Sequence, residues 1–131
     1  MSTLIASPTT MTRSSGFWTV LLAVVHVLAT PLFYADSLQS ILDAGVLGAV
    51  DSDPDLTTLR AAAFWYVTAG LLLGAVGWMV MLAERRGTGA PRGFALALGL
   101  TGAWGVILSP LSGFWLFLVI AFLARRNTVQ A

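Results

Sequence analysis

The sequence has little of what catalysis and solubility in water require. Cysteine and lysine are absent, and His26 is the only histidine. Without cysteine the chain forms no disulfide, thiolate metal site or thiol nucleophile, and one histidine excludes a multi-histidine metal site within one protomer. A net charge of +1 gives no support to nucleic-acid binding. We therefore expect no metal, no cofactor and no nucleic-acid partner.

Charged residues are also scarce, at 10% of the chain against 57% hydrophobic residues. A soluble domain carries about a quarter charged residues, so most of this chain is expected to lie in lipid. Three stretches lack charged side chains when His26 is neutral: 14–35, 61–83 and 93–124. A membrane-spanning helix takes roughly 17–25 residues, so each of the first two stretches fits one span.

The third stretch is too long for one span, and its middle reads Ser109-Pro110-Leu-Ser-Gly113, which is typical of a turn. The sequence therefore predicts an all-α membrane protein with four helices in an antiparallel bundle, over about 16–34, 54–85, 92–108 and 110–126. One long helix kinked at Pro110 is the alternative for the last two.

The arginines lie almost entirely on one side of this predicted bundle. The other side holds Arg60 and all five aspartates. Cytoplasmic loops of membrane proteins are enriched in arginine. We therefore predict a multi-pass protein of the bacterial cytoplasmic membrane with both termini in the cytoplasm. The arginines on the predicted cytoplasmic side are Arg13, Arg85, Arg86, Arg92, Arg125 and Arg126.

Three segments lie outside the predicted spans. Residues 1–13 are expected to form a disordered tail, with Met11 as an alternative start to Met1, and residues 127–131 form a second tail. Residues 37–50 repeat apolar side chains at helical spacing, which predicts a short amphipathic helix on the outer membrane face or capping the bundle. A disordered acidic loop is the alternative. Asp53 as N-cap and Pro54 as first helical residue would then begin the second long helix.

Small residues recur every three or four positions in two predicted helices. The second helix carries Gly70 and Gly74, and the third carries Gly99 and Gly102. Small side chains let membrane helices approach closely. We expect these glycines to pack helices within one chain, and homodimerisation is the alternative use.

His26 is the only titratable side chain near the predicted bilayer midplane. Polar groups at that depth are costly and are candidates for function. The imidazole can relay protons, ligate haem or bind a quinone. It can equally donate to a backbone carbonyl, and Pro31 leaves that of Val27 free because proline has no N–H.

Arg60 is the only arginine on the predicted outer side. It can pair with Asp36 or Asp43 and hold the outer segment on the helices, or it can bind a phosphate group. Nearby aromatic side chains can line an outer pocket with Arg60 or anchor helix ends at the interface. These aromatic residues are Trp65, Tyr66 and Trp115.

Two short motifs carry a family resemblance: Arg60-Ala-Ala-Ala-Phe-Trp-Tyr66 and Pro110-Leu-Ser-Gly-Phe-Trp115. Over about 13–126 the chain resembles a family of small four-helix membrane proteins of unknown function, common in actinobacteria. More distantly it is similar to the DoxX-like membrane proteins. Neither resemblance implies an established activity. The likeness favours these positions for testing: His26, Arg60, Trp65, Pro110, Gly113 and Trp115.

These patterns favour a non-enzymatic structural or accessory membrane component that binds membrane lipids or a partner membrane protein. No carboxylate lies within a predicted span, which disfavours proton-coupled cation export, and no catalytic set is visible. One alternative is a binding or transport protein with an outward pocket around His26, Arg60 and Trp65. A membrane enzyme acting on a lipid-soluble substrate is a further alternative.

Overall fold

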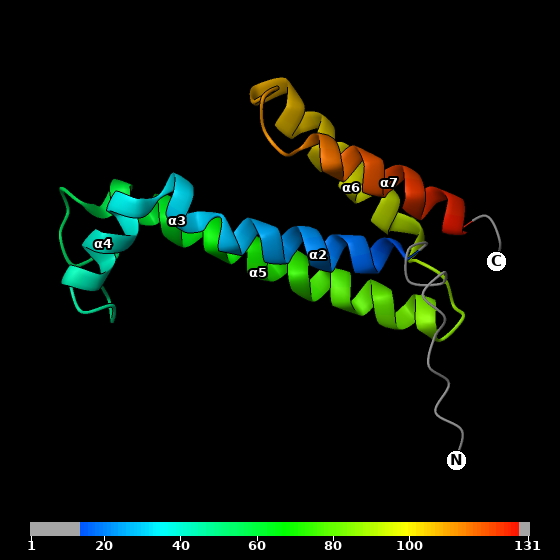
Figure 1. Ribbon diagram of the computed structural model, residues 1–131, viewed down its shortest axis with the longest axis horizontal. Helices are drawn as coiled ribbons and strands as arrows, with labels where there is room; N and C mark the ends of the chain where they lie inside the picture. The colour runs from blue at the N-terminus through cyan, green and yellow to red at the C-terminus, as the bar shows by residue number, and fades with distance from the viewer. Residues whose placement is uncertain (1–13, 129–131) are drawn as a thin grey trace, which may run out of the picture. The chain divides into compact units, whose positions relative to one another are not determined.

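The computed structural model describes residues 14–128, which are all-helical, with six helices and no strand in that range (Figure 1). The predicted all-α class is confirmed. The predicted tail over 1–13, with Arg13 and the alternative start Met11, lies outside the described residues, as do residues 129–131. The described chain divides into two compact units, residues 14–22 with 75–128, and Ala23–Gly74.

The helices follow the predicted order, but several begin or end elsewhere. The predicted helix over 16–34 is interrupted at Ala29. Pro31 cannot donate to the carbonyl of Val27, which instead accepts the Thr30 hydroxyl at 2.7 Å. The helices are α2 (Ser15–Leu28), α3 (Thr30–Phe33), α4 (Ala35–Asp43), α5 (Thr57–Arg85), α6 (Arg92–Leu108) and α7 (Trp115–Thr128).

In the unit Ala23–Gly74, the end of α2 packs in antiparallel direction against α5. A Cβ atom at Gly70 would lie 2.6 Å from Cγ2 of Val27, and one at Gly74 would lie 3.4 Å from the Cβ of Ala23. The two glycines predicted to pack helices therefore do so within one chain.

The segment between α3 and α5 in the same unit begins with α4, which runs across the direction of α5 (Figure 1). The helix ends where Gly45 takes a φ of +83°. The N–H groups of Gly45 and Val46 then return to the carbonyls of Leu42 and Ile41, at 3.0 and 3.1 Å. The amphipathic helix predicted over 37–50 is observed as α4, which starts two residues earlier, at Ala35. It ends at Asp43, earlier than predicted, because the left-handed Gly45 terminates it.

The long helix α5 begins at Thr57 and not at Pro54. The Asp53 carboxylate accepts the N–H of Asp55 at 3.0 Å, and its carbonyl accepts the N–H of Leu56 at 3.1 Å. An aspartate that bonds the backbone two residues on forms a turn of its own. Asp53 and Pro54 thus form the turn before the helix, and the predicted start was three residues too early.

In the other unit, α6 and α7 form an antiparallel hairpin. A Cβ at Gly102 would lie 2.9 Å from Cδ2 of Leu118, and one at Gly99 would lie 3.8 Å from Cβ of Ala121. The alternative of one long helix kinked at Pro110 is therefore wrong. However, α7 begins at Trp115 and not at Pro110, because residues 109–114 form the turn itself.

Among the described residues, one helix is long and apolar enough to cross a membrane by itself. This helix is α5, with 29 residues. The apolar helices α2 and α6 are shorter, at 14 and 17 residues.

Candidate functional site

His26 lies on α2 and contacts Tyr66 of α5. Its Nε2 atom is 3.0 Å from the backbone carbonyl oxygen of Tyr66, and the two rings stack with centroids 3.8 Å apart. Because a carbonyl oxygen only accepts, Nε2 is the donor. The predicted carbonyl partner of His26 was that of Val27. That oxygen instead accepts a hydrogen bond from the Thr30 hydroxyl.

The aromatic residues beside Tyr66 divide into two groups. Tyr34 contacts Tyr66 with a tilted ring, whose centroid is 4.9 Å from that of Tyr66. Trp65 is 65% exposed and packs edge-on against Phe64. Tyr66, and not Trp65, is therefore the aromatic partner of His26.

Trp115 and Gly113 belong to the other compact unit. The Trp115 indole donates to the carbonyl of Pro110 at 2.8 Å, across the turn that joins α6 and α7. Gly113 has open space where a Cβ would lie. Trp115 thus stabilises the turn before α7 within its own unit, whereas Gly113 makes no close approach that requires a glycine.

Arg60, in the first turn of α5, is only 6% exposed. Its Nε donates to the Ser40 hydroxyl at 2.8 Å. Its Nη1 donates to the carbonyl of Ala49 at 2.7 Å and to the hydroxyl of Ser52 at 2.8 Å. Arg60 therefore ties α4 and the following loop to α5, as one prediction had it. Its partners are uncharged oxygens, however, and not the predicted carboxylates of Asp36 or Asp43.

Two N–H groups of the Arg60 guanidinium make no hydrogen bond within the described chain. The guanidinium has five N–H groups, and the three bonds above use the one on Nε and both on Nη1. No buried side-chain nitrogen or oxygen in the described part of the chain lacks a hydrogen-bond partner. Nη2, which makes no hydrogen bond, therefore keeps some surface in contact with solvent.

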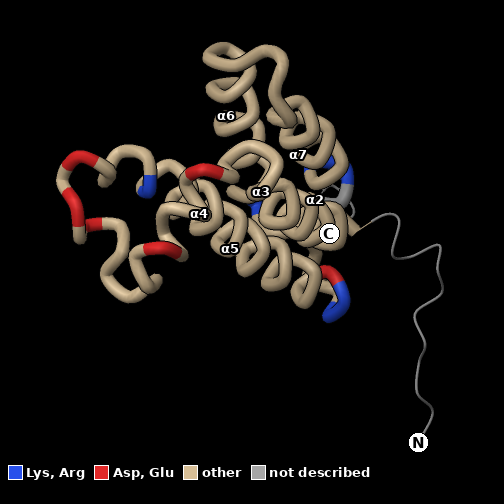
Figure 2. The backbone as a smooth tube through the Cα atoms, turned by 60° about the vertical axis from the view of Figure 1, so that its left-hand side comes forward, with Lys and Arg blue, Asp and Glu red and all other residues tan. Residues whose placement is uncertain are grey.

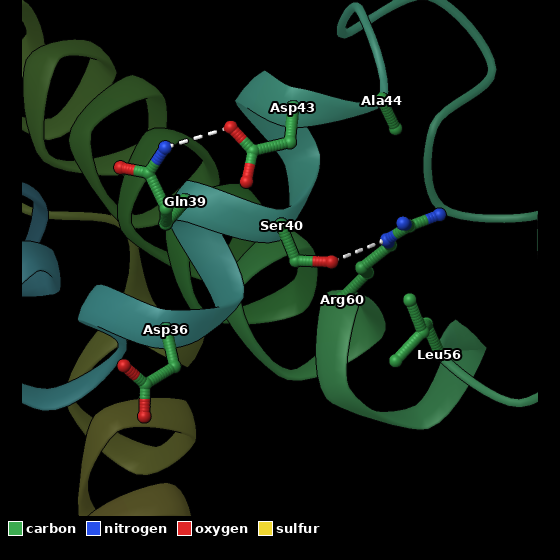
Figure 3. Close-up of a pocket in the computed structure, with 7 residues that line it drawn as sticks. All are labelled: Asp36, Gln39, Ser40, Asp43, Ala44, Leu56 and Arg60. Atoms are coloured by element: carbon green, nitrogen blue, oxygen red, sulfur yellow. Dashed lines mark hydrogen bonds between the residues drawn. The ribbon is translucent and has the colours of Figure 1, made fainter.

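Beside Arg60 lies a shallow, open depression of about 390 Å³. Figure 3 shows Arg60 on one side of Ser40, with Asp36 and Asp43 on the other side, where Gln39 donates to Asp43 at 2.8 Å. Figure 2 shows that acidic residues gather around α4 and the loop that follows it. The predicted pocket around His26, Arg60 and Trp65 is not the one found, since only Arg60 lines the depression. The lining residues are Asp36, Gln39, Ser40, Asp43, Ala44, Leu56 and Arg60.

A second polar site, which the sequence did not indicate, lies in the other unit at the start of α2. Glu84, the only glutamate of the chain, comes from the last turn of α5. Its carboxylate accepts the hydroxyls of Ser14 and Ser15, both at 2.5 Å. It also accepts the N–H groups of Ser15 and Gly16, at 3.0 and 3.2 Å. A paired serine ahead of an apolar run signals a helix start, but nothing local identifies a carboxylate about seventy positions away as its cap.

The end of α5 approaches α2 closely beside this cap. A Cβ at Gly77 would lie 2.9 Å from the Cβ of Thr19, a residue with no exposed surface. A Cβ at Gly16 would overlap the backbone nitrogen of Met81. The serine and glycine positions of this site thus hold two helix ends together, and they leave no room for a ligand between them.

Comparison with known proteins gives a family but no activity. The model of a family of unknown function, DUF6463, matches residues 10–130. No curated protein and no solved structure showed a significant match. The expected resemblance to a family of unknown function is confirmed, whereas the actinobacterial association and the likeness to DoxX-like proteins stay predictions.

Proposed function

The chain belongs to the DUF6463 family of unknown function, and we propose that it is an integral membrane protein with four spans that acts as a non-enzymatic structural or accessory component. In this proposal both termini face the cytoplasm, and the apolar helix surfaces contact membrane lipids or a partner membrane protein.

The observation that carries the proposal is the apolar surface of α5. Only 22% of its most apolar stretch is buried. Leu71, Leu72 and Met79 are exposed by 62%, 62% and 68%. The central helix of a soluble protein would be mostly buried, and contiguous exposed apolar surface in water promotes aggregation. In lipid the same surface is well solvated.

The α6–α7 hairpin supports the proposal in the same way. Leu100, Trp104 and Ile107 are 64%, 66% and 75% exposed on α6, and Phe122 is 56% exposed on α7. The hairpin arms are short, at 17 and 14 residues, or about 25 and 21 Å. The proposal therefore includes local thinning of the bilayer, which is roughly 30 Å thick in its apolar core, and snorkelling of the arginines that end α7.

The polar residues support a structural role over a catalytic one. His26 and Arg60 each bond to the chain's own oxygens. A catalytic side chain needs donors or acceptors that reach a substrate. The hydrogen bonds of His26 and Arg60 instead stabilise contacts of α5 with α2, α4 and the loop after α4. The remaining hydrogen-bonding capacity lies on Nδ1 of His26 and on Nη2 of Arg60, a residue that lines the depression.

Single-cysteine labelling tests the four spans, and the natural absence of cysteine makes every introduced thiol unique. Asp51→Cys and Leu111→Cys are expected to react with a membrane-impermeant maleimide in intact cells. Thr88→Cys should react only after the cells are opened, because it lies in the loop with the arginines. All three side chains are exposed. If Leu111→Cys stays unlabelled from outside while Asp51→Cys is labelled, the α6–α7 hairpin does not cross the membrane and the proposal fails.

Native purification tests the accessory role. We expect the protein, extracted in a mild detergent, to retain phospholipid or a partner membrane protein in near-stoichiometric amount, as measured by mass spectrometry of the intact complex. A purified protein that carries neither lipid nor partner, yet stays folded, would contradict a binding role. Retention of a small lipophilic metabolite instead would favour the transport alternative.

A further inference from the structure

The depth of Arg60 along α5 places it at the level of lipid headgroups, if α5 spans the membrane as proposed. The apolar core of a bilayer, about 30 Å, takes about 20 residues at roughly 1.5 Å each. Counted back from Arg85 at the inner edge, the outer edge falls at Trp65. Arg60 then lies about 7.5 Å further out, at the outer limit of a headgroup layer of roughly 5–7.5 Å. The phosphates of the outer leaflet lie at this depth.

The charges around the depression have both signs. Arg60 has two N–H groups on Nη2 that make no hydrogen bond within the described chain, and a guanidinium binds phosphate oxygens through pairs of such donors. On the other side of Ser40, the depression is lined by the carboxylates of Asp36 and Asp43 (Figure 3). Asp43 accepts one bond from Gln39, and a carboxylate can accept about four. The two carboxylates disfavour an anion without a cation of its own, and Arg60 gives a ligand that also carries a phosphate a second charged contact.

We propose that this depression binds the zwitterionic headgroup of a phosphoethanolamine-type phospholipid. The phosphate lies against Nη2 of Arg60, and the primary ammonium lies against the carboxylate of Asp43, while Asp36, two turns earlier on α4 and about 10 Å away, adds negative charge to the same depression. The shallow, open form of the depression suits a headgroup whose acyl chains stay in the bilayer. This inference rests on the proposed membrane span, and it adds the chemical class of lipid and the residues that select it.

Lipid selectivity tests the proposal directly. The intact protein is placed in nanodiscs with equal amounts of phosphatidylethanolamine, phosphatidylcholine and phosphatidylglycerol, and released into the gas phase for native mass spectrometry. We expect phosphatidylethanolamine to be enriched about fivefold among retained lipids, since each charge-assisted bond contributes on the order of 1 kcal/mol. Phosphatidylcholine lacks N–H donors, and phosphatidylglycerol lacks the cation. Retention in the bulk ratio would overturn the proposal.

Variants identify the residues. The double variant Asp36→Asn with Asp43→Asn should reduce the enrichment to the bulk ratio; both side chains are exposed, so the fold is retained. The matched control, Asp51→Asn with Asp55→Asn, removes two exposed carboxylates outside the depression and should leave the enrichment unchanged. Equal losses in both pairs would show a general charge effect and sink the assignment. Unchanged enrichment in the first pair would do the same.

Two further measurements separate neighbouring explanations. Soluble phosphoethanolamine should not bind the protein in detergent at micromolar concentration, because it lacks acyl chains; tight binding without lipid enrichment would assign the site to a free metabolite instead. Cysteine labelling of the aspartate double variant should match that of the parent. If the parent protein shows no lipid enrichment but the expected labelling pattern, only the headgroup proposal fails. If the labelling pattern itself differs from the expected one, the proposed membrane span fails.

Discussion

A Glu84→Ala variant is expected to lose about 3 kcal/mol of unfolding free energy, among the largest effects of any single substitution in the chain. The carboxylate accepts four hydrogen bonds from the start of α2. The first N–H groups of a helix have no partner within the helix. Ser15 has no exposed surface, so its N–H and hydroxyl would be left buried without acceptors, and each such group costs about 1–3 kcal/mol.

Thermal unfolding of the purified protein in detergent, followed by circular dichroism, measures this loss. Glu84→Gln keeps one acceptor oxygen without the charge and should lose about half as much. The matched control is Arg86→Ala, two residues along the chain, whose side chain is exposed. Its unfolding should stay within about 0.5 kcal/mol of the parent. A Glu84→Ala variant as stable as Arg86→Ala would show that the cap contributes nothing.

The elements predicted correctly from the sequence are those with a local cause. The absence of charge over 93–124 and the turn residues around Pro110 predict a hairpin, and α6 and α7 form one. The spacing of Gly99 and Gly102 predicts close packing, and both face α7. Helix ends were less accurate, because they depend on which of several turn residues bonds the backbone, as at Asp53 and Gly45.

The polar partners were predicted less well because they are distant in sequence. His26 bonds to Tyr66, forty positions away, and Glu84 reaches Ser14, seventy positions away. Charge alone suggested that Arg60 pairs with a carboxylate, since five aspartates adjoin it. A buried guanidinium nevertheless needs several acceptors in one plane, and a folded loop supplies these from Ala49 and Ser52. Such a set exists only once the chain has folded.

The second large effect is expected for Gly16→Ala, at about 3 kcal/mol of unfolding free energy. A Cβ at Gly16 would overlap the backbone nitrogen of Met81 and lie 2.8 Å from the carbonyl oxygen of Gly77. Backbone atoms cannot rotate away as a side chain can, so the start of α2 must move away from the end of α5. Overpacking of this kind typically costs about 1–3 kcal/mol, and here the movement also lengthens the bonds to Glu84.

The matched control for Gly16→Ala is Gly99→Ala, which makes the same substitution inside α6. A Cβ at Gly99 would lie 3.8 Å from that of Ala121, an ordinary contact. Alanine in a helix is more favourable than glycine by up to about 1 kcal/mol, so this variant should be as stable as the parent or more so. Equal stability of the two variants would contradict the close approach at Gly16.

A double-mutant cycle then shows whether the close approach and the cap act as one unit. If displacement of α2 already breaks the bonds to Glu84, the variant with both Gly16→Ala and Glu84→Ala should lose less than the sum of the single losses, by about 1 kcal/mol or more. Strict additivity would mean that each contact acts alone. A coupled result would make the start of α2 and the end of α5 one cooperative element, fixed by a glycine, a paired serine and the only glutamate of the chain.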